Sequence, residues 1–252
     1  MTSEQTHALP PAVVALVDEL ATMPGVRAVV LGGSRGRSTN VDAASDWDLC
    51  LYYRAAIDLK TLATHGTVYP PGSWGRVMNG GAWLHCGGEK VDVMLRDLDV
   101  VEHWMRRAQD GQYEVDALLG YVAGVPTYSL WAELASCRLL RGELPTAGPF
   151  PPKLVAAAPV RWRFHRDFSL DYARMHARRS NVVGAAAQAA KAVMEEAHAI
   201  ACERALWVLN EKRLIECAGL ERVQKRFERI PRDATDLVRW VEQVAAELAP
   251  AG

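Results

Sequence analysis

Apolar residues in the first half of the chain form short runs that alternate between helical and extended spacing. Residues 10–23 place Val13, Leu16, Val17 and Leu20 on one helical stripe, with prolines at the start of the segment. Continuous runs rich in β-branched and apolar residues predict four strands, at 26–31, 47–53, 82–86 and 90–97. Helical spacing returns at 97–109 and 128–140. The alternation predicts a sheet flanked by helices.

The second half of the chain has a different character. Residues 141–153 carry four prolines and two glycines, which is typical of a linker. Beyond Leu154 no segment has strand periodicity, and residues 181–214 predict one helix of about 30 residues, followed by two shorter ones. The fold class expected is therefore α+β: a mixed-sheet domain over 1–145 and an all-helical bundle over 152–252.

Composition narrows the class of partner. The net charge is −1, with 29 basic and 30 acidic residues, so the chain lacks the basic excess typical of nucleic-acid binding. No apolar run reaches the ~20 residues of a membrane span, and the first residues lack the pattern of a signal peptide. Five scattered cysteines suggest buried free thiols in a reducing compartment. These features predict a cytoplasmic protein without a membrane or nucleic-acid partner.

Candidate phosphate-binding residues lie where the first strand ends. Gly32 and Gly33 let an anion approach the backbone, and Ser34 adds a hydroxyl donor at a predicted helix start. Arg35 and Arg37 add cations that suit phosphate oxygens. Alone, this motif is also compatible with an ordinary turn.

Three aspartates supply candidate metal ligands. Asp46 and Asp48 are two residues apart at a strand start, so both point to one face, and Asp92 lies mid-strand between valines. An aspartate in such a strand is costly unless it is paired or bound to a metal. Carboxylate oxygens suit Mg²⁺, which takes phosphate oxygens for the rest of its shell. The alternative for the first pair is a turn cap and a solvated strand edge.

The segments "LGGS", "SDWDLCL" and "VDVML" together resemble the signature of the nucleotidyltransferase superfamily typified by DNA polymerase β. The resemblance implies a mixed-sheet catalytic domain that binds ATP or another nucleoside triphosphate with Mg²⁺, in a site that holds two metal ions. It implies that Asp46, Asp48 and Asp92 are catalytic and metal-binding. AMP would pass to a hydroxyl with release of pyrophosphate. The helical domain that follows is similar in layout to antibiotic nucleotidyltransferases of the aminoglycoside and lincosamide type, which makes a small antibiotic-like acceptor the first expectation.

The helical half offers further candidates by the same resemblance. Glu195 or Glu196 is the alternative to Asp92 as the general base. The spacing of Lys191 and Glu195 is also typical of an exposed i, i+4 ion pair on a helix. Lys212 is expected to contact phosphate, or else to complement a helix end. A basic stretch at 161–179 reads either as a cleft wall or as a solvated helix face.

Most tryptophans are expected to pack in the core, with Trp74, in an irregular loop, as the candidate for stacking on a ring. Two other readings stay open: an enzyme that modifies a protein or an RNA end, and a nucleotide-binding regulator without catalysis. The sequence selects neither the acceptor nor the base of the nucleotide nor an oligomeric state.

Overall fold

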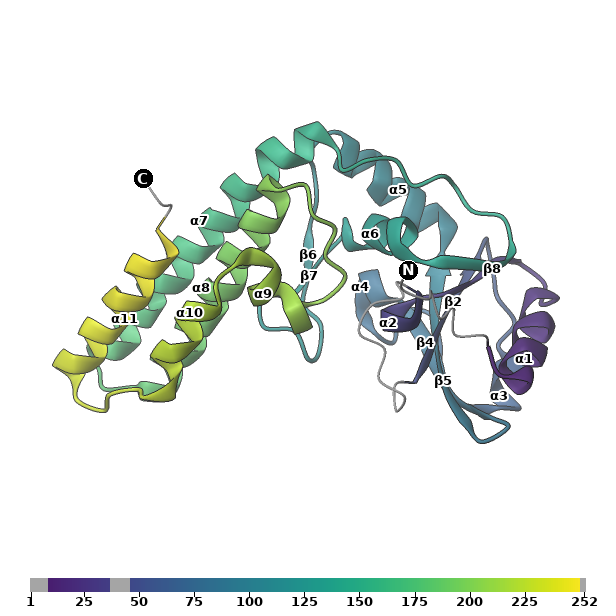
Figure 1. Cartoon of the computed structure of the whole chain (residues 1–252), viewed down its shortest axis with the longest axis horizontal. Helices are drawn as coiled ribbons and strands as arrows, with labels where there is room; N and C mark the ends of the chain where they lie inside the picture. Colours follow the sequence, from purple (N-terminus) through teal and green to yellow (C-terminus); the bar gives the residue numbers. More distant parts are fainter. Residues whose placement is uncertain (1–8, 37–45, 250–252) are drawn as a thin grey trace, which may run out of the picture. The chain divides into compact units, whose positions relative to one another are not determined.

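A computed structural model of the chain describes residues 9–36 and 46–249. A six-stranded mixed sheet flanked by helices precedes a helical region, which confirms the expected α+β class (Figure 1). No helix within the described residues is long and apolar enough to cross a membrane.

The chain divides into two compact units. The sheet unit comprises residues up to Arg106 together with Leu130–Gly148, and the helical unit comprises Arg107–Ser129 together with the residues from Pro149 onward. The last of the three crossings between the units falls inside the proline-rich segment 141–153. The expected limit of the first domain, residues 1–145, includes residues 107–129. In the structure these residues belong to the helical unit.

The sheet unit contains six strands in the spatial order β3-β4-β5-β2-β1-β8. Strands β2 and β5 pair in parallel, and every other pair in this sheet is antiparallel. Its strands are β1 (Val26–Leu31), β2 (Trp47–Tyr53), β3 (Gly66–Tyr69), β4 (Gly80–Cys86), β5 (Glu89–Asp97) and β8 (Arg138–Gly142). Its helices are α1 (Pro11–Ala21), α2 (Gly33–Gly36), α3 (Lys60–Ala63), α4 (Gly75–Met78), α5 (Leu98–Gln109, which runs into the helical unit) and α6 (Ser129–Ser136).

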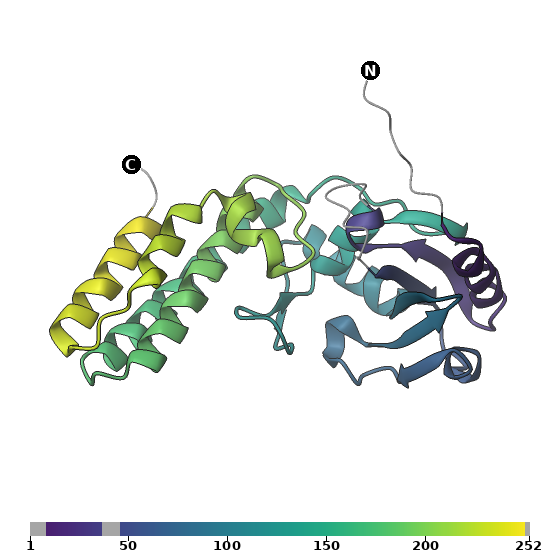
Figure 2. The ribbon, with the colours of Figure 1, turned by 60° about the horizontal axis from the view of Figure 1, so that its bottom comes forward.

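Alternation along the strands gives this sheet two different faces. One face packs on α1, where Val13, Leu16 and Leu20 join alternate strand residues such as Leu49 and Val93 in one buried cluster. Figures 1 and 2 both show α1 beside the sheet. The intervening residues of β2 and β5 point to the other face, and they include Asp48 and Asp92.

Several local predictions are confirmed and others need correction. The strands at 26–31 and 47–53 have the expected bounds, and those expected at 82–86 and 90–97 lie within β4 and β5. These two strands form a hairpin through Gly87 and Gly88, both at positive φ. The loop around Trp74 is less irregular than expected, because it lies between β3 and α4. The helix expected over 128–140 ends at Ser136 and is followed by the edge strand β8.

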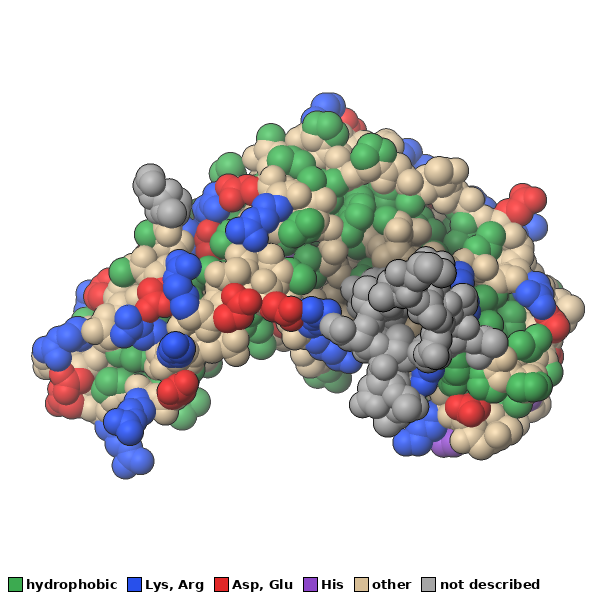
Figure 3. Space-filling model, viewed as in Figure 1, with side chains coloured by type: hydrophobic (Ala, Val, Ile, Leu, Met, Phe, Trp, Pro, Cys, Tyr) green, Lys and Arg blue, Asp and Glu red, His purple; other side chains and the backbone are tan. Residues whose placement is uncertain are grey.

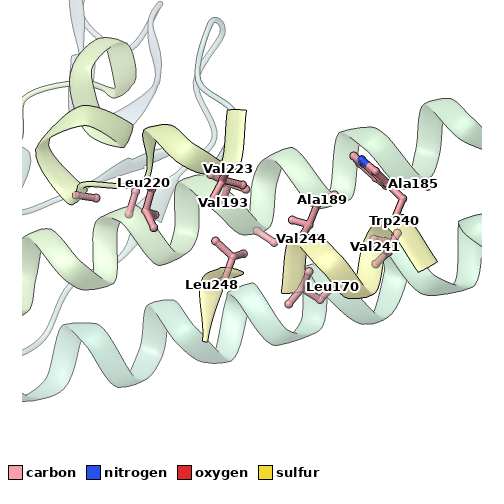
Figure 4. Packing of buried hydrophobic residues seen from close by; sticks show 14 of the residues in the cluster. Leu170, Ala185, Ala189, Val193, Leu220, Val223, Trp240, Val241, Val244 and Leu248 are labelled. Atoms are coloured by element: carbon pink, nitrogen blue, oxygen red, sulfur yellow. The ribbon is translucent and has the colours of Figure 1, made fainter. Parts of the chain in front are cut away.

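The helical unit is built around two long antiparallel helices. Figure 4 shows how α11 packs against them through Leu170, Val193, Trp240 and Val244, which belong to one buried apolar cluster. Its helices are α7 (Pro152–Ala177), α8 (Val182–Glu203), η1 (Glu211–Arg213), α9 (Leu214–Ala218), α10 (Glu221–Gln224), η2 (Lys225–Glu228) and α11 (Ala234–Leu248). A two-stranded ribbon of β6 (Val115–Asp116) and β7 (Val125–Pro126) completes the unit. Acidic and basic side chains are interspersed over the helices in Figure 3.

The single helix expected over 181–214 is wrong, because α8 ends at Glu203. Ala205 takes a positive φ of 53°, its N–H donates to the carbonyl of Cys202, and the N–H of Leu206 donates to that of Ala201. This hydrogen-bond pair is a Schellman motif, which stops a helix without the usual glycine.

All five cysteines lie in the described part of the chain and are free thiols, as expected. Cys50 and Cys202 are buried, whereas Cys217 is exposed, so the expectation that all five are buried is wrong. Burial raises the pKa of the Cys50 thiol well above its usual value. That thiol is therefore held in its protonated, unreactive form.

Candidate active site

Strand pairing brings two of the three candidate aspartates together. Asp48 on β2 and Asp92 on β5 are direct partners in the parallel ladder, so their α-carbons lie about 4.8 Å apart in the hydrogen-bonding direction. Their neighbours Trp47, Leu49 and Val93 lie in the core on the α1 side, so both carboxylates point to the opposite face. Both aspartates are half-buried. The sheet therefore holds a pair of carboxylates side by side on the face away from α1.

The glycine turn after β1 lies directly against this pair. The N–H of Gly32 donates to the Asp48 carbonyl at 2.8 Å, which extends the β1–β2 pairing into the turn. Gly33 has a φ of +59°, and a Cβ atom there would lie 1.8 Å from the Asp48 Oδ2 atom. No side chain fits in that space. Glycine at position 33 thus lets the Asp48 carboxylate rest on the backbone of the turn.

Among the remaining candidates that the structure describes, it does not bring Asp46 or Ser34 into the pair formed by Asp48 and Asp92. Asp46 is exposed and directly precedes β2. Within residues 9–36 and 46–249, no group of three or more Asp, Glu, His and Cys side chains could hold a metal ion. Ser34 lies in α2, and Arg37 lies outside the described residues.

Arg35 contacts the strand through an aromatic side chain. Its guanidinium lies over the Trp47 ring, 4.1 Å from the ring centre, and the Trp47 indole N–H donates to Glu89 Oε2 at 3.0 Å. Because Trp47 is part of the core on the α1 side, this contact joins the glycine turn to β2 on the side away from Asp48. Arg35 therefore helps to hold the turn against the strand that carries Asp48.

Further along the same face, a buried charge cluster joins the two central strands to α6. Glu133 accepts from Tyr52 at 2.7 Å and from two nitrogens of Arg96 at 2.8 and 2.9 Å. Burial opposes the charge of Arg96, but Glu133 outweighs it and leaves the pKa of the guanidinium raised. Arg96 follows Asp92 by four residues on one strand, so the two share a face. The alternation of residues along β5 places Arg96 on the face of Asp92, so the sequence could have indicated its position. Nothing in the sequence identified Glu133 as the partner of Arg96.

The candidate residues of the helical unit are engaged within that unit. Glu196 is 2% exposed and accepts from Arg163 and Arg166, at 3.0 and 2.6 Å at the shortest. Glu195 is 1% exposed, not exposed as one reading supposed, and its carboxylate is 3.6 Å from the Lys191 ammonium. Burial raises the Glu195 pKa, against the opposing influence of Ser169 and Lys191. Arg163 and Arg166 of the basic stretch 161–179 therefore form ion pairs with buried Glu196 inside the helical unit.

Lys212 lies on the surface of the helical unit. It is exposed within η1, and its backbone N–H donates to the Asn210 side chain at 3.0 Å. This contact caps a short helix and leaves the ammonium group in contact with solvent.

Comparisons with known proteins place few limits on function. No family model matches the chain, and no curated protein matches it significantly. Among solved structures, the chain is similar to a nucleotidyltransferase-like protein from Exiguobacterium sibiricum, at 13% identity and a TM-score of 0.45. The match covers 94% of this chain and 73% of the other. At that distance the similarity carries no argument about chemistry, which has to come from the site itself.

Proposed function

We propose that this protein is a Mg²⁺-dependent nucleotidyltransferase that transfers the nucleotidyl group of ATP, or of another nucleoside triphosphate, to a hydroxyl of a small acceptor. The observation that carries the proposal is the pairing of Asp48 with Asp92 beside Gly33. A carboxylate pair on one sheet face, next to a turn without side chains, suits a metal ion and a polyphosphate together.

The donor set fits the proposed ion. Mg²⁺ in phosphate-transfer sites is commonly held by one or two carboxylates, with phosphate oxygens and waters as its other ligands. Asp48 and Asp92 supply two such carboxylates, and Asp46 is the third candidate at the strand start. When bound, the ion would neutralise charge on the phosphates and on the entering and leaving oxygens.

The protein's own residues would mainly position the reactants. The Gly32–Gly33 turn would let the leaving phosphates approach backbone N–H groups on the side that Asp48 leaves open, because neither glycine carries a side chain. Asp48 is fixed by the turn on one side and by β5 on the other. Asp92 would accept the proton of the attacking hydroxyl, and the pyrophosphate would depart on the side of the turn.

Calorimetric titration with a non-hydrolysable ATP analogue tests this proposal. Wild type should bind the analogue much more tightly with Mg²⁺ than without it, and Asp48→Asn should lose the difference. Asp58→Asn, an exposed aspartate of the same unit, is the matched control and should bind as wild type. Transfer of label from α-labelled ATP to an acceptor then separates an enzyme from a nucleotide-binding regulator. Metal-independent binding that Asp48→Asn does not change would refute the proposal.

A further inference from the structure

Three aromatic side chains gather on the sheet face beside Asp92. Tyr69 comes from β3, Trp74 from the turn before α4, and Trp83 from β4. The ring centres of Tyr69 and Trp83 are 4.7 Å apart, those of Tyr69 and Trp74 are 5.1 Å apart, and those of the two indoles are 6.1 Å apart. We call this group the aromatic wall. Nothing in the carboxylate site described above uses it.

A glycine in the sheet makes room for the wall. A Cβ atom at Gly81 would lie 2.4 Å from a ring carbon of Trp74, so the indole packs directly on the strand backbone. Gly81 pairs with Tyr69 across the β3–β4 ladder, so both point to this face. Trp74 and Tyr69 thereby support Trp83 from one side, which leaves Trp83 with little freedom to turn away.

Trp83 is unusually open to solvent for a tryptophan. It is 51% exposed, whereas the other tryptophans are buried or half-buried. Ring stacking was expected of Trp74, but Trp74 is the supporting residue and Trp83 presents the open indole. A large exposed aromatic surface next to polar catalytic groups is typical of a ligand-binding surface.

The wall lies on a defined side of the carboxylate pair. Trp83 is the direct partner of Asp92 across the β4–β5 ladder, and both belong to the face that carries Asp48. Across the sheet the order is therefore the Gly33 turn, Asp48, Asp92 and Trp83. In an in-line displacement, the attacking oxygen is opposite the leaving group. With pyrophosphate at the Gly33 turn, the acceptor enters on the side of Trp83.

We infer that the aromatic wall is the acceptor subsite of the proposed transferase, and that the acceptor carries its reacting hydroxyl on or beside a flat ring that stacks on Trp83. The hydroxyl oxygen bonds to the α-phosphorus while the bond from that phosphorus to the pyrophosphate oxygen breaks, and the hydroxyl proton passes to Asp92. Sugar rings and aromatic rings both meet this requirement, because each offers an apolar face that packs on an indole. This inference rests on the proposed function for the direction of attack.

Ring binding can be followed through the indole N–H signals of the isotope-labelled full chain by NMR, with Mg²⁺ and a non-hydrolysable ATP analogue present. The probes are methyl β-glucopyranoside and 2-phenylethanol, which carry a hydroxyl on or beside a ring, and glycerol as the open-chain control. At least one ring probe should shift the Trp83 signal, which is assigned by its loss in Trp83→Phe, and glycerol should not. The Trp83 variants lack this signal, so their ring binding is followed through the indole N–H signal of the adjacent Trp74. From the usual strength of stacking, Trp83→Ala should weaken ring binding about 10- to 100-fold.

Two further variants keep the result specific. Trp83→Phe retains a ring and should retain most of the binding, whereas Phe168→Ala removes a different exposed ring, 57% exposed on α7, and should change nothing. Both Trp83 variants should bind the ATP analogue as wild type. The inference fails if neither ring probe exceeds glycerol, or if Trp83→Ala binds rings as wild type.

The same titrations separate this inference from the proposed function. Analogue binding that needs Mg²⁺, without ring binding at Trp83, overturns the acceptor subsite and leaves the transferase proposal standing. If rings bind at Trp83 but the ATP analogue binds equally well with and without Mg²⁺, the transferase proposal is overturned. The ring-binding surface can then no longer be assigned to an acceptor.

Discussion

Replacement of Gly33 by alanine tests how closely the glycine turn and the carboxylate pair depend on each other. The new Cβ would lie 1.8 Å from Asp48 Oδ2, 2.7 Å from its Cγ and 3.1 Å from its Cβ. The backbone there has a φ of +59°, which costs a non-glycine residue about 1–2 kcal/mol. The Asp48 carboxylate is the end of a short side chain and can rotate away, so the fold should survive with about that loss of stability.

The loss of function should be much larger than the loss of stability. Rotation of Asp48 away from Gly33 moves its oxygens by more than an ångström, and a displacement of that size in a catalytic group costs about 10²-fold in rate. We expect Gly33→Ala to lose Mg²⁺-dependent binding of the ATP analogue and to lower label transfer by at least about 10²-fold. Calorimetry and α-label transfer measure these effects, and chemical denaturation measures the stability.

A control separates the clash from the backbone strain. Gly219 also has a left-handed backbone, with a φ of 74° and a ψ of 32°, but a Cβ atom there would meet nothing within 4 Å. Gly219→Ala should lose similar stability and keep full nucleotide binding. If Gly33→Ala binds nucleotide with Mg²⁺ as wild type does, the contact between the turn and Asp48 has no part in the site, and the reasoning is refuted.

Three further predictions concern charge. Asp92→Asn should lower label transfer at least about 10²-fold and leave unfolding by denaturant unchanged; near wild-type transfer would remove Asp92 from the mechanism. Glu133→Gln should lower the free energy of unfolding by about 3–5 kcal/mol, because buried Arg96 keeps its charge and loses its partner. Glu216→Gln, which breaks an exposed ion pair, is the control. A decrease for Glu133→Gln that is no larger than that of the control would contradict this prediction. Burial lowers the pKa of His198 to about 3, so the unfolded chain binds a proton below about pH 6.5 that the folded chain does not. Between pH 7.5 and pH 5, the free energy of unfolding of wild type should therefore fall by about 2 kcal/mol more than that of His198→Phe, as measured by chemical denaturation. Equal decreases would show that His198 does not cause the pH dependence.

Local sequence patterns were sufficient for most of the sheet. The strands at 26–31 and 47–53 are apolar except for Arg27 and Asp48, and the first is followed by Gly32, so propensity and turn signals agree. The edge strand β8 was missed because the five residues of Arg138–Gly142 include two arginines and follow a helix without a break in pattern. Its pairing with β1 is a tertiary effect that no window of sequence contains.

Helix ends were harder to predict where an ordinary residue terminates the helix. Ala205 ends α8 in a left-handed conformation, and alanine is otherwise the best helix former. The apolar periodicity of 181–214 therefore continues through a point where the backbone turns. Packing of the following segment, in which Val208 and Leu214 join the core of the helical unit, outweighs the local preference.

The candidate site depends on register more than on composition. The sequence placed Asp48 and Asp92 on strands, but their contact requires β5 to lie beside β2 in parallel with no residue of slip. The β4–β5 hairpin, whose register is set by its two-residue loop Gly87–Gly88, places Trp83 beside Asp92. Residue types indicated the chemistry, and strand order determined which of them meet.

The most direct test of the central claim is a crystal structure of the protein with Mn²⁺ in place of Mg²⁺ and a non-hydrolysable nucleoside triphosphate. Mn²⁺ accepts the same oxygen ligands and scatters anomalously. The account predicts an anomalous peak within ligand distance of both the Asp48 and Asp92 carboxylates, with the phosphates over Gly33. A nucleotide bound with its metal away from these two side chains, or a pair that stays without metal at saturating Mn²⁺, would contradict it.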